Sequence, residues 1–217
     1  GGKLMHRSEE DYLKAIYEIS VNTESNLVKS VDVAETLGFT VQSVNEKIKR
    51  LDSKGYVNFI PYKGVELTKK GLEESIRMVR AHRIWEVFLM EKLGYSWHEV
   101  HEEAEDLEHA ASDKLIERIY NLIGRPKYCG HGNPIPSFDG KIENIYKKSL
   151  FEFDLGSNFI LKRVFDNKKL LIDLNKKDIK INDEFNVLSK NDKVIIIVKN
   201  NIEYTITNNQ SKMLFGD

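Results

Sequence analysis

The sequence predicts an α+β multidomain protein, because three different residue patterns follow one another along the chain. Helical spacing dominates the N-terminal half, a glycine- and proline-rich stretch follows at residues 124–140, and short β-type runs fill the remainder. The length of 217 residues also exceeds the roughly 100 to 150 residues of a typical domain. We therefore expect two or three compact units, with one boundary at the glycine- and proline-rich linker.

Composition restricts the class of protein further. Hydrophobic residues make up 41% and charged residues 31% of the chain, a balance that excludes a disordered protein. The apolar runs fall short of the roughly 20 residues of a membrane helix, and no charged-then-apolar leader opens the sequence. Cys129 is the single cysteine, so we expect no disulfide framework and a bystander thiol. Together these features predict a cytoplasmic protein without a membrane partner.

Three helices are predicted near the N-terminus. Ser8 and the acidic residues after it form a helix-start pattern, and helical spacing continues to about Ile19. A short amphipathic helix fits residues 30–38, where Gly38 suits a C-cap. Thr40 can cap the next helix, whose apolar residues recur on one face. Two helices joined by this tight turn form a helix-turn-helix.

A β-hairpin is predicted directly after the helix-turn-helix. Residues 56–60 are rich in β-branched and aromatic types, residues 61–64 supply turn chemistry, and residues 65–67 can return as a strand. The combination is a winged helix-turn-helix, whose second helix fits the major groove of DNA. Because the net charge is only −1, DNA contacts must come from local basic patches.

Helices and then strands are expected in the rest of the chain. The apolar spacing of residues 74–93 predicts a long helix that Gly94 can end. Two more helices are expected near 97–110 and 112–123. From residue 141 on, short apolar runs alternate with turn residues, which predicts a small all-β unit of SH3-like barrel type. The expected strands include residues 159–161, 170–172, 185–188 and 194–198.

A row of metal-ligand residue types lies on one predicted helix. His101, Glu105, Glu108 and His109 follow one another at spacings of three and four residues, so their side chains share one helix face. Nitrogen and carboxylate donors suit Mn(II), Fe(II), Co(II), Ni(II) and Zn(II). A solvated acidic helix with incidental histidines would show the same row. Further donors are needed to favour metal binding.

Two other predicted helices supply those donors. His82 and Glu86 have the same spacing on the preceding long helix, and facing helices are a usual way to build a metal site. Asp11 adds a carboxylate near the start of the first helix, where it could also be only a capping residue. The second histidine–carboxylate pair favours metal binding over a solvated acidic helix.

With these motifs, the sequence resembles the diphtheria toxin repressor and manganese transport regulator family. Members are iron- or manganese-activated repressors of metal uptake. The resemblance covers the whole chain and would make it a metal-dependent DNA-binding repressor with a C-terminal SH3-like, FeoA-like domain. The stretches that carry it are residues 10–17, 51–56, 80–83, 100–109 and 131–136.

The resemblance implies two metal sites. It maps a primary, regulatory site to Asp11, Glu105, Glu108 and His109. It maps an ancillary site to His82, Glu86 and His101, completed by Asp166 from the C-terminal domain.

The donor types at two of these positions bear on the metal. Iron-type members carry Met and Cys where this chain has Asp11 and Glu105, and hard carboxylates favour Mn(II) over Fe(II). Zn(II), Co(II), Ni(II) and Cd(II) are possible surrogates. Lys14 replaces a second acid of some two-domain manganese regulators, so we do not expect their binuclear cluster.

The motifs and the resemblance also predict the domains and the binding partners. We expect a winged helix-turn-helix domain at residues 1–72, a helical metal-binding and dimerisation domain with its linker at 73–140, and the SH3-like domain at 141–217. The apolar faces of the 74–93 and 112–123 helices predict a homodimer on a palindromic operator in double-stranded DNA. No organic cofactor is expected. The predicted DNA-binding residues are Thr40, Gln42, Ser43, Asn45, Glu46, Lys47, Arg50, Tyr62 and Lys63.

Two other classes of protein could use parts of this pattern. A di-metal enzyme also needs rows of His and Glu, but the chain has no nucleophile elbow, phosphate loop or His-Glu-x-x-His motif. An enzyme would also leave the helix-turn-helix unexplained. A winged-helix regulator of an organic ligand would need a less acidic pocket. The metal-dependent repressor therefore remains the prediction, with manganese as the effector and iron as the alternative.

Overall fold

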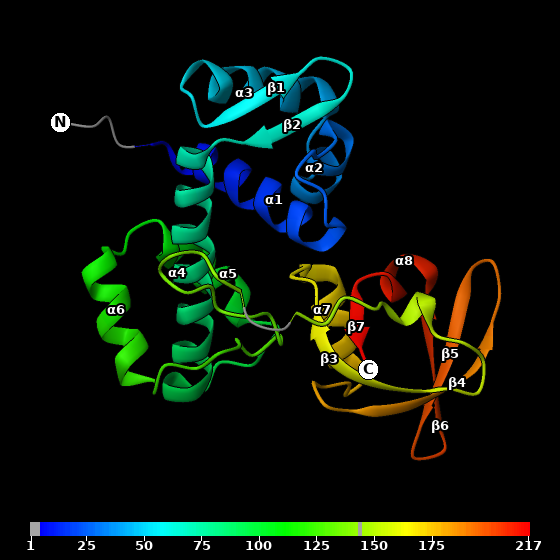
Figure 1. The fold of residues 1–217 in the computed structure, drawn as a ribbon. Helices are drawn as coiled ribbons and strands as arrows, with labels where there is room; N and C mark the ends of the chain where they lie inside the picture. Colours follow the sequence, from blue (N-terminus) through cyan, green and yellow to red (C-terminus); the bar gives the residue numbers. More distant parts are fainter. Residues whose placement is uncertain (1–4, 143–144) are drawn as a thin grey trace. The chain divides into compact units, whose positions relative to one another are not determined.

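The computed structural model describes residues 5–142 and 145–217 (Figure 1). The chain divides into two compact units. The first unit comprises Gly1–His82, Glu108–Asp113 and Pro136–Lys141, and the second comprises Arg83–Leu107, Lys114–Ile135 and Ile142–Asp217. The predicted domain boundaries after residues 72 and 140 remain predictions.

The first unit begins with three helices, α1 (Arg7–Thr23), α2 (Ser30–Leu37) and α3 (Val41–Ser53). Helices α2 and α3 form the predicted helix-turn-helix. Gly38 ends α2 in the left-handed conformation, and the Thr40 hydroxyl accepts a hydrogen bond from the Ser43 amide, as predicted.

The ends of α1 differ from the prediction. The helix begins at Arg7 rather than Ser8, because His6 and Glu9 form the capping box. It also runs past Ile19 to Thr23. The Thr23 hydroxyl bonds the carbonyl of Ile19, and the left-handed Glu24 then ends the helix. The last turn lies beyond the buried positions of α1, so apolar periodicity does not report it.

A hydrophobic core holds the three helices together. Its fully buried members include Leu13 and Ile16 of α1 and Val44, Ile48 and Leu51 of α3. Burying each side chain of this size contributes about 1.5 to 3 kcal/mol. Because these residues recur every three to four positions, the opposite face of α3 stays exposed.

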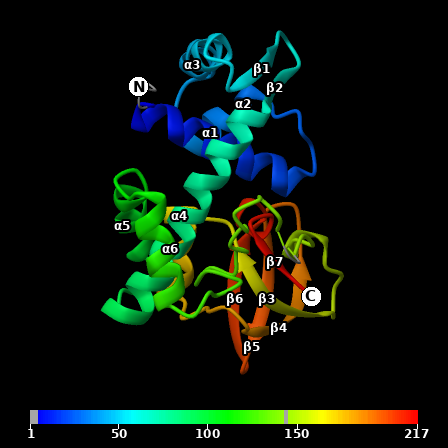
Figure 2. The same cartoon turned by 60° about the vertical axis from the view of Figure 1, so that its left-hand side comes forward.

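The predicted wing is present. Strands β1 (Val57–Ile60) and β2 (Gly64–Leu67) pair antiparallel, with Val57 opposite Leu67, and β1 packs beside α3 (Figure 2). Gly64 is required at the base of the turn, because a Cβ there would lie 2.4 Å from the Val28 carbonyl oxygen. At the tip, Tyr62 has a positive φ of 64° and a fully exposed side chain, a conformation that costs energy and is often found at functional sites.

Three further helices follow the wing, α4 (Lys69–Leu93), α5 (Val100–Glu108) and α6 (Asp113–Leu122). Helices α4 and α5 carry most of the predicted metal ligands. Gly94 follows α4 with a φ of 74°, as expected of a helix-ending glycine. Among the described residues, no helix is long and apolar enough to cross a membrane.

The C-terminal part of the second unit is an antiparallel sheet that resembles an SH3-like domain, as predicted. Within residues 145–217 the sheet has five strands in the order β6-β5-β4-β3-β7 (Figure 1). Its core includes Phe159, Leu161, Phe185 and Val187 from the alternating inward positions. The strands are β3 (Asn158–Val164), β4 (Glu184–Lys190), β5 (Val194–Lys199), β6 (Ile202–Thr207) and β7 (Leu214–Gly216).

One predicted strand of this domain is wrong. Residues 170–172 belong to helix α7 (Lys168–Lys176), so the unit is not purely β. The Asn167 side chain caps the helix by accepting from the Leu170 amide, and Leu170, Leu171 and Leu174 are buried at helical spacing. A run of three apolar residues fits either a strand or a helix, and the Asn167 cap is a feature of a helix. Two shorter elements complete the fold, η1 (Leu150–Glu152) and α8 (Asn208–Ser211).

Candidate metal centres and nucleic-acid interface

The first candidate metal centre joins helix α1 to the end of α5. Ligand atoms of Asp11, Glu108 and His109 lie within 4.8 Å of one another. His109 Nε2 is 3.0 Å from Asp11 Oδ1 and 3.6 Å from Glu108 Oε1. Three residues predicted for the primary site therefore meet. Glu105, the fourth, lies one helical turn before Glu108 on α5.

These donors fit a divalent cation. His109 Nε2 is buried and forms no hydrogen bond of acceptable geometry with any residue that the structure describes, although two carboxylates are nearby. A buried polar atom without a hydrogen bond is costly, and a metal ion would satisfy it. One imidazole nitrogen with carboxylate oxygens is a donor set suited to Mn(II), Fe(II) or Zn(II).

The surroundings of His109 also change its acidity. Burial alone would lower the pKa of the ring, but the nearby carboxylates of Asp11, Glu10 and Glu108 raise it to about 9. At neutral pH the metal-free ring is therefore protonated. A metal ion that binds the ring must displace a proton.

Lys14 contributes a fixed positive charge beside Glu108. Its Nζ lies 2.9 Å and 3.1 Å from the two Glu108 oxygens and 3.1 Å from His82 Nδ1. His82 Nδ1 also contacts Glu108 Oε2. Burial raises the pKa of Glu108, but the charges of Lys14 and His82 outweigh it and lower the value. His82, predicted for the ancillary site, therefore contacts a predicted primary-site residue.

A second candidate centre lies within the second unit. Ligand atoms of Glu86, Cys129 and His131 lie within 4.8 Å of one another. His131 Nδ1 is 2.9 Å from Glu86 Oε1 and 3.0 Å from Asp166 Oδ1. The structure thus brings together Glu86 and Asp166, two predicted ancillary ligands, and adds two donors that the sequence interpretation missed.

The orientation of His131 is fixed by its other nitrogen. His131 Nε2 lies 2.6 Å from the carbonyl oxygen of Trp97. A carbonyl can only accept, so Nε2 carries the proton and Nδ1 faces Glu86 and Asp166. Such a hydrogen bond to the remote nitrogen is typical of metal-binding histidines.

The position of His131 depends on the chain around Gly132. The amide of Val164 on β3 donates to the His131 carbonyl at 2.9 Å. Gly132 has a φ of 76°, and a Cβ there would lie 1.9 Å from the Lys162 carbonyl oxygen. Asn133 Nδ2 donates to the Val164 carbonyl at 3.0 Å. The linker is thus held against β3, just before Asp166.

Cys129 is buried in this cluster, and its expected role as a thiol without function stays a prediction. Burial and the charge of Glu86 raise the pKa of Cys129 to about 12. The free thiol is therefore neutral, and it would become a ligand only by losing its proton to an incoming metal ion. The spacing Cys129-x-His131 was a signal for this site that the sequence interpretation did not use.

His101 lies between the side chains of two carboxylates in the second unit. Its Nε2 is 3.4 Å from Glu105 Oε1, and its Nδ1 is 3.9 Å from Glu86 Oε1. Burial alone would lower the pKa of His101, but Glu105 and Glu86 raise it to about 10. His101 therefore lies near Glu86, another residue predicted for the ancillary site, and also contacts Glu105.

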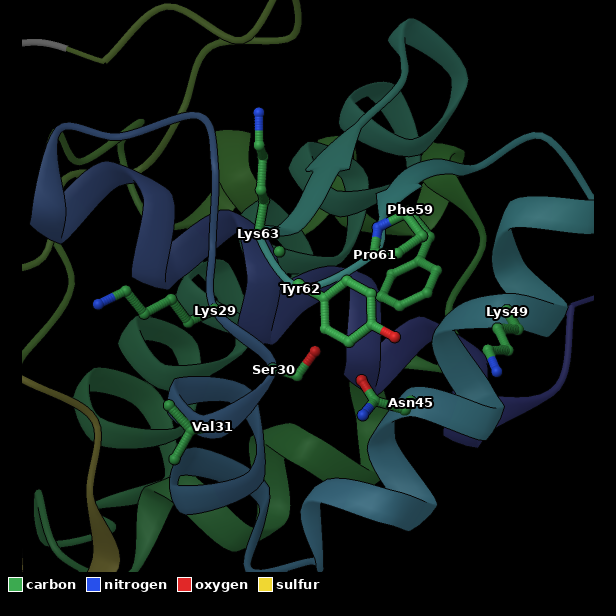
Figure 3. Close-up of a pocket in the computed structure, with 10 residues that line it drawn as sticks. Lys29, Ser30, Val31, Asn45, Lys49, Phe59, Pro61, Tyr62 and Lys63 are labelled. Atoms are coloured by element: carbon green, nitrogen blue, oxygen red, sulfur yellow. The ribbon is translucent and has the colours of Figure 1, made fainter.

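The candidate nucleic-acid interface lies on α3 and the wing. All nine predicted DNA-binding residues are exposed or partly exposed. A groove of about 520 Å³ opens between α2, α3 and the wing, where Tyr62 lies near Asn45 (Figure 3). Lys29, Lys49 and Lys63 line it. Lys29 was not predicted, although its place before the positive end of α2 suits a phosphate contact.

The first turns of α1 contact the same helix α3. Lys47 Nζ donates to the Ser8 hydroxyl at 2.9 Å, and Lys54 pairs with Glu9. The Tyr12 ring stacks on Phe39 with a centroid distance of 6.1 Å. Asp11 therefore belongs to a helical turn that also touches the helix-turn-helix.

A winged helix-turn-helix in a chain that also carries clusters of carboxylates and histidines indicates a metal-dependent DNA-binding regulator. The family described as iron dependent repressor, N-terminal DNA binding domain, matches residues 4–65. The family described as iron dependent repressor, metal binding and dimerisation domain, matches residues 68–137. The chain belongs to this family of metal-dependent transcriptional repressors, which includes the diphtheria toxin repressor.

Individual relatives agree with this assignment. An HTH-type transcriptional regulator of Methanocaldococcus jannaschii is 38% identical over 115 residues, which cover 53% of this chain and 91% of that protein. The diphtheria toxin repressor of Corynebacterium glutamicum is 27% identical over 198 residues and 86% of both chains. The solved structure of the manganese regulator SloR matches with a TM-score of 0.84 and 33% identity, covering 96% of this chain and 97% of that one.

Proposed function

We propose that this protein is a Mn(II)-activated repressor that binds a palindromic operator as a homodimer and controls genes of metal uptake. The observation that carries the proposal is the meeting of Asp11, Glu108 and His109 beside a helix-turn-helix. Membership of the repressor family supports the DNA-binding and metal-dependent parts. The choice of metal, the operator and the regulated genes are the proposed steps.

Manganese is proposed because the donors of the primary site are hard. Asp11, Glu105 and Glu108 offer carboxylate oxygens, and His109 offers one imidazole nitrogen. Mn(II) accepts such a set, whereas a soft sulfur donor would favour softer metals. Fe(II) is the alternative effector. Zn(II), Co(II), Ni(II) and Cd(II) are proposed as surrogates, and the solved relative ScaR has bound Zn(II) and Cd(II).

A separate ancillary site is proposed in the second unit. Glu86, His131 and Asp166 surround one imidazole nitrogen, and Cys129 adds a sulfur. We extend the predicted ancillary set by Cys129 and His131 and retain His101 beside Glu86. Because the site draws on the linker and the residue after β3, metal binding there would hold the SH3-like domain to the linker.

The regulatory step is proposed to act through α1. A divalent cation would supply the positive charge that holds Asp11 to Glu108 and His109. Ser8 and Glu9 connect the same turn of α1 to Lys47 and Lys54 of the recognition region. A fixed α1 would therefore restrict α3 to orientations that fit DNA, which is a linkage between metal and DNA binding.

On the DNA side, base recognition is proposed for the exposed first turns of α3. Gln42 can pair with adenine and Glu46 can accept from cytosine. Lys47, Lys49 and Arg50 would contact phosphates, as would Tyr62 and Lys63 from the wing. A twofold dimer would present two such surfaces to half-sites about one helical turn apart. We propose binding rather than catalysis as the function.

The test is selection of DNA from a random duplex pool by the full chain with Mn(II), with Fe(II), and with a chelator. The proposal predicts enrichment of a palindrome with Mn(II) and none with the chelator. Equal enrichment of one sequence without metal would contradict metal dependence. Enrichment with Fe(II) alone would replace manganese by iron as the effector.

A further inference from the structure

Glu10 lies beside the candidate primary site but belongs to neither predicted ligand set. It precedes Asp11 on α1 and is buried, with 8% of its surface exposed. Its two oxygens have different partners. Glu10 Oε2 is 2.6 Å from His109 Nδ1, and Glu10 Oε1 is 2.8 Å from a terminal nitrogen of Arg77.

The two nitrogens of His109 therefore face different carboxylates. Nδ1 meets Glu10, whereas Nε2 lies near Asp11 and Glu108. An imidazole that binds a metal through one nitrogen can carry a proton only on the other. Glu10 lies on the Nδ1 side of the ring, so it cannot share an ion held at Nε2.

We propose that Glu10 is a positioning residue that accepts the Nδ1 proton of His109 and so directs Nε2 toward Asp11 and Glu108. Arg77 fixes the Glu10 carboxylate in this position. Its guanidinium is itself held by Glu74 on α4. The pair Glu10–His109 has the carboxylate–histidine arrangement that orients metal-bound imidazoles and raises their basicity. This inference rests on the proposed metal-binding role of His109.

The arrangement has a consequence for the metal-free protein. The ring is already aimed, so binding does not have to order it, and less affinity is lost to side-chain entropy. Without the carboxylate, the ring could turn or expose Nδ1 toward the ligands. Removing such a partner typically weakens metal binding by about 10- to 100-fold.

The test compares wild type with Glu10→Ala, Glu10→Gln and the control Glu103→Gln. Glu103 is an exposed carboxylate on α5, outside both proposed sites. Mn(II) affinity is measured by titration calorimetry. We expect Glu10→Ala to lose about 10- to 100-fold, and Glu10→Gln to lose less because its amide oxygen still accepts. The control should match wild type.

A second measurement separates positioning from general destabilisation. NMR of the metal-free chain with ¹⁵N-labelled histidine should show a slowly exchanging His109 Nδ1 proton in wild type and Glu10→Gln. It should be absent in Glu10→Ala. If wild type binds Mn(II) through His109 and Glu10→Ala binds equally well, the role of Glu10 is wrong. If His109→Ala leaves the affinity of wild type unchanged, the proposed primary site itself fails.

Discussion

The ammonium group of Lys14 lies 2.9 Å from Glu108 Oε2, and both side chains are buried. The Lys14 ammonium thus forms a buried ion pair with Glu108, a proposed metal ligand. A second acid at this position would extend the carboxylate cluster, whereas Lys14 neutralises part of it. The pair explains how a metal-free chain tolerates a Glu108 side chain that is only 1% exposed.

Removing this charge should destabilise the metal-free protein. Lys14→Met leaves Glu108 buried without its ammonium partner, so we expect the free energy of unfolding to fall by about 3 kcal/mol. Urea denaturation in chelator measures it, and Mn(II) should restore part of the loss. The control Lys69→Met alters a side chain that is 91% exposed and should change stability by less than about 0.5 kcal/mol. Equal effects of the two variants would contradict the burial argument.

Mn(II) affinity should rise with pH up to about 9, the value to which the pKa of His109 is raised. Below it the ring is protonated, so binding releases a proton and each lower pH unit should cost about tenfold in affinity. Above it the dependence should flatten. Calorimetry in buffers of different ionisation enthalpy counts the protons. His109→Gln should lower the count, whereas His98→Gln, outside both sites, should not.

Cadmium should report the ancillary site through Cys129. Because the thiol is buried beside Glu86 and His131, Cd(II) should produce a thiolate-to-metal charge-transfer absorption band. Cys129→Ala should abolish the band and one equivalent of bound metal, while Mn(II) binding at the primary site remains. A Cd(II)-saturated wild type without the band would exclude the thiol as a ligand.

The wing and α3 should contribute differently to DNA binding. Lys63→Ala should weaken binding to all sequences and reduce the salt slope by about 1, because it removes one phosphate contact. Gln42→Ala should instead cost about 1 to 3 kcal/mol at one base position. Binding curves over a salt series separate the two effects. Lys193→Ala, an exposed lysine between β4 and β5, should match wild type, and any large loss there would contradict the proposed interface.

The sequence predicted those parts of the fold that local rules determine. Gly38 and Thr40 mark a helix end and a helix start through backbone conformation and capping, so the helix-turn-helix could be placed closely. Helix α7 was missed because its run of three apolar residues fits a strand as well, whereas the Asn167 cap and the helical spacing of Leu171 and Leu174 indicate a helix. A short apolar run alone therefore does not determine the element.

The candidate sites also contain residues that the sequence predicted and residues that it did not. Asp11 and His109 were assigned by resemblance, and they lie 3.0 Å apart. His131 was missed because it lies in the linker, whose path has no periodicity. It reaches Asp166 only because Gly132 adopts a positive φ and the linker pairs with β3. Such a contact between distant segments follows from tertiary structure: the Cys129-x-His131 spacing indicates two donors but does not indicate Asp166 as their partner.

The central claim is that metal held at Asp11 controls DNA binding. The most direct test is fluorescence anisotropy with a duplex from the selection experiment, at fixed salt, during titration with Mn(II). For wild type and Glu103→Gln, Mn(II) should raise DNA affinity on the order of 10- to 100-fold, and Asp11→Ala should bind weakly throughout. The account is contradicted if chelation leaves the wild-type affinity unchanged, or if Asp11→Ala responds to Mn(II) as wild type does.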